Sequence, residues 1–317
     1  MYGAFPAMNS TGLPINTTQV SIVNNKTLEI VRMTFLILSY FCFCFFIYFI
    51  TMILYIFFSN AQIRESARYV LFAHMLINDT LYLIGGLFLL VASLYLAFIP
   101  VPVCYVIVTL VSCTFRITPY NLAVMSLERY VAICHPLRHA EFCSGHRSTT
   151  AVALIWALGL TPNVVDFITL SLSAEKRFFS LRVICSKETL TVNPTQNTIR
   201  SNVLVITLCL VASIIIYTYI KVMLVAHKLG SGTSSAIKAG RTVLLHALQL
   251  LLSMMSLISL YIEVNVKEYV VLLAISNFLF FMCLPRFLSP LIYGLRDEVF
   301  GKYLRKLYSV HVSIKLR

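Results

Sequence analysis

Long apolar segments separated by short polar ones occupy most of the chain. The hydrocarbon core of a bilayer is ~30 Å thick, and a helix needs about 20 apolar residues to cross it. Because lipid offers the backbone no hydrogen bonds, such segments are expected to be helical. Segments of this length lie at 33–58, 69–92, 104–134, 149–172, 199–227, 239–262 and 269–293. The pattern predicts an all-α membrane protein, a seven-transmembrane helix bundle.

The segments outside the bundle are polar. Residues 1–32 contain no basic segment followed by a short apolar core, so the pattern favours an N-terminal tail over a cleavable signal peptide. Residues 294–317 begin with alternating apolar and basic positions, typical of a short interfacial helix, here called helix 8. We expect a tail at 1–32, the helical domain at 33–293, and helix 8 with a second tail at 294–317.

Basic residues predict the orientation. With the N-terminus outside, fifteen of the 25 Lys and Arg residues fall on the cytoplasmic side and eight on the opposite side. The remaining two, Arg116 and Arg286, fall within spans. The excess of positive charge inside favours an extracellular N-terminus and a cytoplasmic C-terminus. The tail would then present three glycosylation acceptors to the outside, Asn9, Asn16 and Asn25.

Composition separates the possible partners. Of the 317 residues, 59% are hydrophobic and 12% charged, far below the roughly 25% charged residues of soluble domains. The net charge of +13 lies mainly at cytoplasmic span ends, where anionic lipid attracts it, so membrane lipid is the expected partner and nucleic acid is not. The expected location is the plasma membrane, with several crossings.

Two of the nine cysteines face the outside in this topology. The other seven lie in spans or at cytoplasmic ends, where thiols stay reduced. Cys104 opens the third span and Cys185 lies in the loop between spans four and five. A disulfide between them would hold this loop as a lid over the outer end of the bundle.

A charged pair ends the third span. In MSLERYVAICHPLRH, Glu128 and Arg129 lie side by side where the surrounding sequence predicts a buried helix. Glu128-Arg129-Tyr130 resembles the Asp/Glu-Arg-Tyr signature that closes the third helix of rhodopsin-like (class A) G-protein-coupled receptors. Other matches are the position of Cys104 before Arg129, Asp79 in the second span, Trp156 in the fourth, and SPLIY at 289–293.

Within that superfamily the motifs are closer to odorant (olfactory) receptors, particularly those of fish. MSLERYVAICHPLRH and PLIYGLR at 290–296 carry this similarity. The resemblance implies a small odorant bound in the outer half of the bundle and a heterotrimeric G protein of the stimulatory, olfactory type, which raises cyclic AMP. It also implies that the residues of the coupling switch are Glu128, Arg129, Tyr130, Tyr293, Asp79, and Tyr217 or its neighbour Tyr219.

The sequence departs from the family at the centre of the bundle. The third span has Thr118 where many odorant receptors have an acid, and Ser289 replaces the usual Asn. The polar cluster is reduced to Asp79, Thr118 and Ser289, which argues against a bound sodium ion. No metal or cofactor is expected.

Arg116 is the leading candidate for a ligand contact. A lone Arg within a span costs several kcal/mol unless something pairs with it. The partner is either an internal acid, with Asp166 the leading candidate, or an anionic ligand held by the guanidinium fork. The two alternatives are compatible if ligand displaces the internal partner. Arg116 also matches the face of the third helix that lines the odorant pocket in the family the chain resembles. That resemblance implies five neighbours at the same site, which are Ser112, Cys113, Asn202, Tyr261 and Glu263.

Other functions remain open at this stage. A class A receptor for a small ligand other than an odorant is the first alternative. A transporter or channel is more remote, because the seven spans show no paired repeats. An enzyme is not expected, since the chain has no His-Glu-x-x-His zinc motif and no evident grouping of Ser, His and Asp.

Overall fold

The computed structural model describes residues 17–142, 145–187, 189–191 and 193–228, and, from the last two spans, 244, 247–248, 251, 278–284 and 286–287. The chain divides into two compact units, Met1–Phe45 and Phe46–Arg317. The expected helix 8, the acceptors Asn9 and Asn16, and the side chain of Asn25 lie outside the described residues.

The first long helix, α1 (Thr17–Ser59), belongs to both units and begins well before the expected start at residue 33. No Pro or Gly interrupts the sequence between Thr17 and Ser59, so nothing in it ends the helix at the membrane surface. The apolar part, Glu29–Ser59, is long enough to cross a bilayer. Within the second unit, Phe46, Ile50 and Ile53 repeat at helical spacing and are buried.

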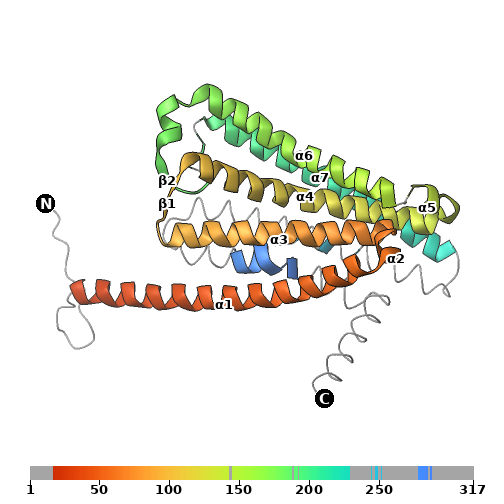
Figure 1. Cartoon of the computed structure of the whole chain (residues 1–317), viewed down its shortest axis with the longest axis horizontal. Helices are drawn as coiled ribbons and strands as arrows, with labels where there is room; N and C mark the ends of the chain where they lie inside the picture. The colour runs from red at the N-terminus through yellow and green to blue at the C-terminus, as the bar shows by residue number, and fades with distance from the viewer. Residues whose placement is uncertain are drawn as a thin grey trace, which may run out of the picture. The chain divides into compact units, whose positions relative to one another are not determined.

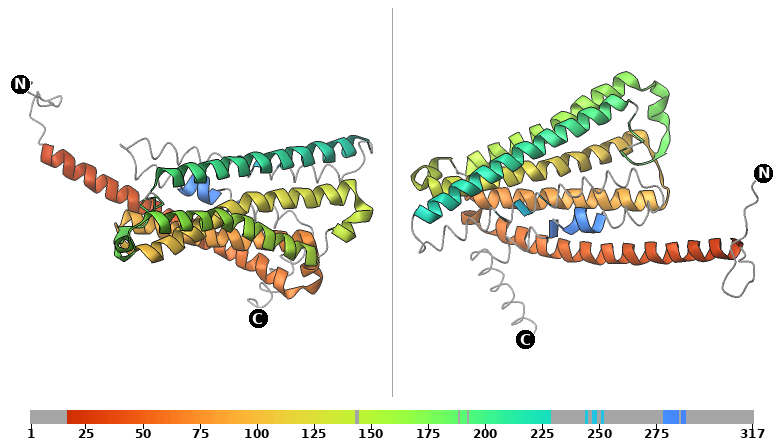
Figure 2. Two further views of the ribbon diagram at one scale, coloured as in Figure 1. Left: turned by 90° about the horizontal axis from the view of Figure 1, so that it is seen from above. Right: turned by 180° about the vertical axis from the view of Figure 1, so that it is seen from behind.

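Four further long helices lie in the second unit (Figure 1). They are α3 (Ala67–Leu94), α4 (Val101–Cys134), α6 (Gly145–Ser173) and α7 (Pro194–Lys228). All are long and apolar enough to span a membrane. α4 packs against α3, α6 and α7, and both views in Figure 2 show it among them. Groups on its buried faces can therefore contact α3, α6 and α7.

The distribution of polar side chains is that of a membrane protein. Phe88, Leu154 and Ile206 are exposed on the outer faces of three helices, whereas α4 buries several polar residues. Lipid favours apolar groups on the outside, and a buried polar group then needs a partner inside the bundle. The polar residues buried on α4 are Thr114, Arg116, Thr118, Asn121, Ser126 and Glu128.

Hydrogen bonds join the helices where apolar packing alone would not fix their register. The Trp156 indole N–H on α6 donates to Nε2 of His74 on α3 at 2.8 Å. The Tyr120 hydroxyl on α4 lies 2.9 Å from Oγ1 of Thr207 on α7. α4 continues without a break through Pro119, which lacks the N–H that the helix would use there.

Short elements connect the long helices. α2 (Ala61–Arg64) joins α1 to α3, and α5 (Pro136–Phe142) joins α4 to α6. A 3-10 helix, η1 (Lys176–Ser180), precedes strand β2 (Arg182–Ile184), which pairs antiparallel with β1 (Phe98–Pro100). In the seventh span, the segment η2 (Phe278–Cys283) is a π-helix.

Candidate functional site

The predicted disulfide is confirmed. Cys104 at the start of α4 and Cys185 directly after β2 are bonded, with their Cα atoms 5.4 Å apart. Both are fully buried in a cluster with Val101 and Leu190. Because disulfides persist in oxidising compartments, the bond supports placing this end of the bundle outside the cell. The loop between α6 and α7 is thereby fixed to the top of α4.

Arg116 lies on α4 and is 6% exposed. Its Nη1 donates a hydrogen bond of 2.7 Å to Oδ1 of Asn163 on α6. Asn163 is held in place by two further hydrogen bonds. Its side-chain Nδ2 donates to the backbone carbonyl of Thr109, and its backbone carbonyl accepts from the Tyr105 hydroxyl at 3.1 Å. The contact that orients the guanidinium is therefore a neutral amide, and among the described residues no acid is bonded to Arg116.

Asp166 is not bonded to Arg116, which corrects the leading candidate for an internal partner. Its carboxylate instead takes both bonds from Arg200 on α7, one from Nε to Oδ1 at 2.9 Å and one from Nη2 to Oδ2. Arg200 also donates from Nη1 to the Thr191 hydroxyl at 2.8 Å, and the amide of Gln196 points at Asp166. Asp166 lies one helical turn beyond Asn163, nearer the disulfide end of α6. Its carboxylate there contacts Arg200 of α7 rather than Arg116.

Sequence reasoning missed Arg200 as a site residue, because it counted Arg200 only as a charge of the outer loop. The residue is 7% exposed and lies within α7. One signal was available: an acid within a span needs a base, and Arg200 is the basic residue at the start of the next span. The outer part of α4, α6 and α7 thus contains two buried guanidinium groups and one carboxylate.

The other expected ligand neighbours differ in their surroundings. Cys113 is buried in an apolar cluster with Ile117 and Ile155, between α4 and α6. Ser112 is half-buried, and Asn202 is exposed on α7. Tyr261 and Glu263 lie outside the described residues. Cys113 therefore packs against α6 on a part of α4 that is dominated by apolar contacts.

Asp79 is fully buried on α3 and meets polar groups of α4. Thr118 donates to its Oδ1 at 3.2 Å, while the amide of the adjacent Asn78 donates to the Thr118 hydroxyl and to the carbonyl of Thr114. Nε of Arg286, in the seventh span, lies 3.9 Å from Asp79 Oδ1. Ser289, the third member of the expected cluster, lies outside the described residues. Sequence reasoning noticed Arg286 in a span but gave it no role.

Glu128 is 8% exposed near the other end of α4, and Arg129 and His139 lie close to its carboxylate. Its Oε2 lies 3.6 Å from Nε of Arg129, and its Oε1 lies 3.2 Å from Nε2 of His139 on α5. Each carboxylate oxygen therefore has its own partner, one from the same helix and one from α5. The His139 contact was not expected from the sequence.

Two of the candidate switch tyrosines lie together. The rings of Tyr130 on α4 and Tyr217 on α7 have centroids 6.0 Å apart, and the Tyr130 hydroxyl lies 3.2 Å from Nε2 of His135. Lys221 lies over the Tyr217 ring, with Nζ 5.7 Å from the ring centroid. Tyr293 lies outside the described residues. Of the two α7 tyrosines left open by the sequence, Tyr217 is the one that faces Tyr130.

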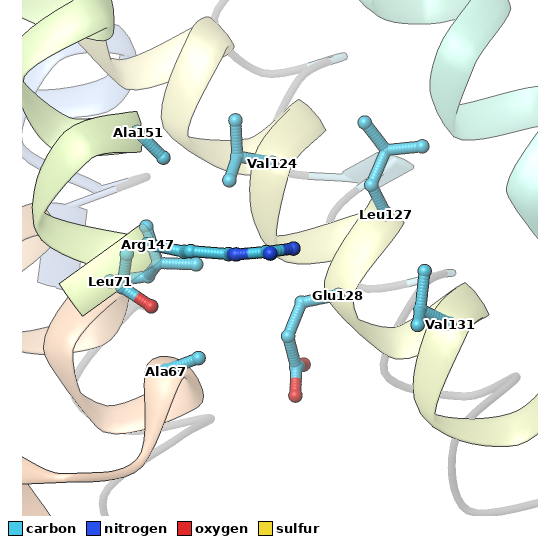
Figure 3. Close-up of a pocket in the computed structure, with 9 residues that line it drawn as sticks. Ala67, Leu71, Val124, Leu127, Glu128, Val131, Arg147 and Ala151 are labelled. Atoms are coloured by element: carbon cyan, nitrogen blue, oxygen red, sulfur yellow. The ribbon is translucent and has the colours of Figure 1, made fainter. Parts of the chain in front are cut away.

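A small hollow adjoins Glu128 where α3, α4 and α6 meet (Figure 3). Its volume is about 200 Å³. Side chains of Glu128 from α4 and Arg147 from α6 extend into it, and apolar residues supply most of the wall. These are Ala67, Leu71, Val124, Leu127, Val131 and Ala151. Among the described residues, no group of three His, Cys, Asp or Glu side chains is placed to hold a metal ion.

Comparison with known families decides the class of protein. Residues 51–293 match the family described as 7 transmembrane receptor (rhodopsin family). The chain is a member of this family of rhodopsin-like receptors. The fold is therefore the seven-transmembrane bundle expected from the apolar segments, and the protein is a receptor rather than an enzyme.

Individual relatives place the receptor more closely. Odorant receptor 131-2 of Danio rerio is 34% identical over 257 residues, which are 78% of each chain. Olfactory receptor 2M3 of Homo sapiens is 28% identical over 194 residues, which are 59% of this chain and 62% of that one. Olfactory receptor 1073 of Rattus norvegicus is also 28% identical to this chain. The receptor belongs to the odorant receptor group, a class of multi-pass proteins of the plasma membrane.

Proposed function

We propose that the receptor binds a small anionic odorant through Arg116 and activates a heterotrimeric G protein of the stimulatory type, raising cyclic AMP. The odorant class and the coupling follow from membership of the odorant receptor group. The negative charge of the ligand is argued from this chain alone. The carrying observation is the hydrogen bond between Arg116 and the neutral amide of Asn163.

Charge favours an anion at this position. Asp166 is engaged by Arg200, so among the described residues the two guanidinium groups share one carboxylate and an excess of one positive charge remains. A buried cation without an acid is costly in a membrane protein. A ligand carboxylate or sulfate would neutralise it and accept charge-assisted hydrogen bonds from the guanidinium fork.

The ligand neighbours follow as part of the same proposal. Ser112 precedes Arg116 by one helical turn. Tyr261 lies at the expected extracellular end of the sixth span, 239–262, and Glu263 directly follows that span. Cys113 and Asn202 complete the proposed set, although Cys113 packs toward α6 and Asn202 is exposed. The lid formed by the loop around Cys185 would close over this ligand.

The output end is proposed to be the Glu128-Arg129-Tyr130 segment. In the resting receptor Glu128 restrains Arg129, and activation would release the guanidinium toward the G protein. Tyr217 packs near Tyr130 and would move with it, while Asp79 and Tyr293 would connect the remaining spans.

The division of the chain belongs to this proposal. We propose an extracellular tail at 1–32, a receptor domain at 33–293 and a cytoplasmic helix 8 with tail at 294–317. Glycans on Asn9, Asn16 and Asn25 of the tail are proposed as well.

A cyclic-AMP assay in cells tests the proposal. The native receptor and an Arg116→Ala receptor would each be exposed to acidic, basic and neutral odorants, with surface expression measured in parallel. We expect acids to activate the native form and to lose activity on Arg116→Ala at equal surface expression. Activation by neutral odorants alone, unchanged in Arg116→Ala, would assign Arg116 a structural role.

A further inference from the structure

The second in-span guanidinium, Arg286, lies in a different environment from Arg116. It is 1% exposed and is among the largest fully buried side chains. Its neighbours are one carboxylate, Asp79, and two aromatic rings, those of Tyr82 and Phe115. The first and second of these come from α3 and the last from α4, so a residue of the seventh span inserts its charge between two other helices.

The aromatic rings form a site for a cation. Cζ of Arg286 lies 4.6 Å from the centroid of the Tyr82 ring and 5.8 Å from that of Phe115. The two rings are 5.8 Å apart and inclined at 35°. A guanidinium over an aromatic face is attracted by the negative face of the ring, most strongly where water is excluded. The rings thus hold the charge near Asp79 without neutralising it.

The carboxylate has an unmet need for positive charge. Asp79 is 0% exposed, and within the described residues its Oδ2 has no hydrogen-bond partner, while Oδ1 accepts only from Thr118. Asn78, which adjoins it, is directed at Thr114 and Thr118 instead. A buried carboxylate of this kind needs a cation close by, and none of the described residues other than Arg286 forms an ion pair with it.

A free monovalent cation does not fit beside this pair. Such an ion prefers several oxygen ligands, and the described residues that carry side-chain oxygens at this point are Asp79, Thr118 and Asn78, whose Oδ1 has no hydrogen-bond partner. The guanidinium already lies 3.9 Å from the carboxylate, so a second cation would be repelled by it. Among the described residues, the charge of Arg286 therefore disfavours a sodium ion held at Asp79.

We propose that Arg286 is a tethered counter-ion, which takes the place of a free sodium ion at Asp79 and links the seventh span to α3 and α4. A tethered cation cannot diffuse away, so the stability of the receptor does not depend on the sodium concentration. Removing the guanidinium leaves Asp79 as a lone buried charge, and the space beside it becomes available to a sodium ion. This role is independent of the ligand that binds near Arg116.

Thermal unfolding of the purified full-length receptor in lipid nanodiscs tests the proposal. Midpoints are compared in sodium chloride and choline chloride at equal ionic strength. The native receptor is expected to unfold at the same temperature in both salts. Arg286→Gln is expected to have a lower unfolding midpoint than the native receptor in choline chloride. Its midpoint is expected to rise by roughly 2–4 °C or more when sodium replaces choline. Arg286→Lys keeps the charge and is expected to show no sodium effect.

The double variant Asp79→Asn with Arg286→Gln has no charge to neutralise and is expected to be indifferent to sodium. If Arg286→Gln alone does not fold, recovery of folding in the double variant supports the pairing, and failure of the double variant overturns it. A native receptor stabilised by sodium over choline would also overturn the proposal, as would a folded Arg286→Gln receptor without sodium dependence. Arg116→Gln serves as the control for loss of a buried guanidinium elsewhere and should gain no sodium dependence.

Discussion

Arg116 and Asn163 face each other across α4 and α6, with 2.7 Å between the guanidinium Nη1 and the amide Oδ1. An amide can orient a guanidinium but contributes no negative charge. An aspartate would have nearly the same shape and would neutralise it. This pair therefore allows the charge at the proposed ligand site to be changed with little change in volume.

Asn163→Asp should supply Arg116 with an internal acid and weaken the response to anionic odorants. We expect the half-maximal concentration for a carboxylic acid to rise about tenfold or more, which corresponds to ~1.4 kcal/mol of binding free energy. Neutral odorants should change little. Dose-response curves for cyclic AMP, corrected for surface expression, provide the measurement. An unchanged response to acids would mean that the charge of Arg116 does not contact the ligand.

The buried pair of Asp166 and Arg200 should stabilise the contact between α6 and α7. Removing one partner, as in Asp166→Asn, leaves an uncompensated buried charge, and loss of ~3–5 kcal/mol of stability is expected. The double variant with Arg200→Gln should lose less than the sum of the two single changes. Unfolding midpoints of the purified receptor report this difference. Strictly additive losses would show that the two side chains do not interact.

Glu128 should restrain Arg129 less effectively once His139 is removed. His139→Ala frees Oε1 of the carboxylate, whereas Glu128→Gln removes the negative charge that both partners share. We expect basal cyclic AMP per surface receptor to rise in both variants, and more in Glu128→Gln. His146→Ala, a change of an exposed histidine at the start of α6, is the matched control. Equal basal activity in His139→Ala and the native receptor would argue against a restraint from α5.

The disulfide should be required for a stable lid. Cys104→Ser and Cys185→Ser are each expected to lower stability by about 2–5 kcal/mol, and the double variant should be no worse than either single change. Cys209→Ser, which alters an exposed thiol on α7, controls for loss of a cysteine. Surface expression and unfolding midpoint are the readouts. A much weaker double variant would indicate that the two cysteines act separately.

The sequence predicted the five described membrane helices well because their signal is local. About 20 consecutive apolar residues suffice to identify a span, and the described spans differ from the expected ones by a few residues at most ends. The start of α1 is the exception, since polar residues before the span continue the helix back to Thr17. Cys104 and Cys185 could be paired because topology left only these two outside.

Side-chain partners were harder to predict, because they depend on which helix faces meet. Asn163 and Asp166 both lie on α6, one turn apart, yet the amide contacts Arg116 of α4 and the carboxylate contacts Arg200 of α7. The pairing of Asp79 with Arg286 could have been predicted from the sequence, since both are charged residues within spans and each needs a partner of opposite charge. His139 had no sequence signal, because its contact with Glu128 depends on the fold of α5.

The most direct test of the central claim compares an odorant acid with its uncharged methyl ester on the native receptor and on Arg116→Gln. The ratio of the two half-maximal concentrations isolates the charge of the ligand from its shape. We expect the native receptor to favour the acid, and Arg116→Gln to lose roughly tenfold to a hundredfold of that preference, the value of a charge-assisted hydrogen bond. A ratio that is the same in both receptors would contradict the account.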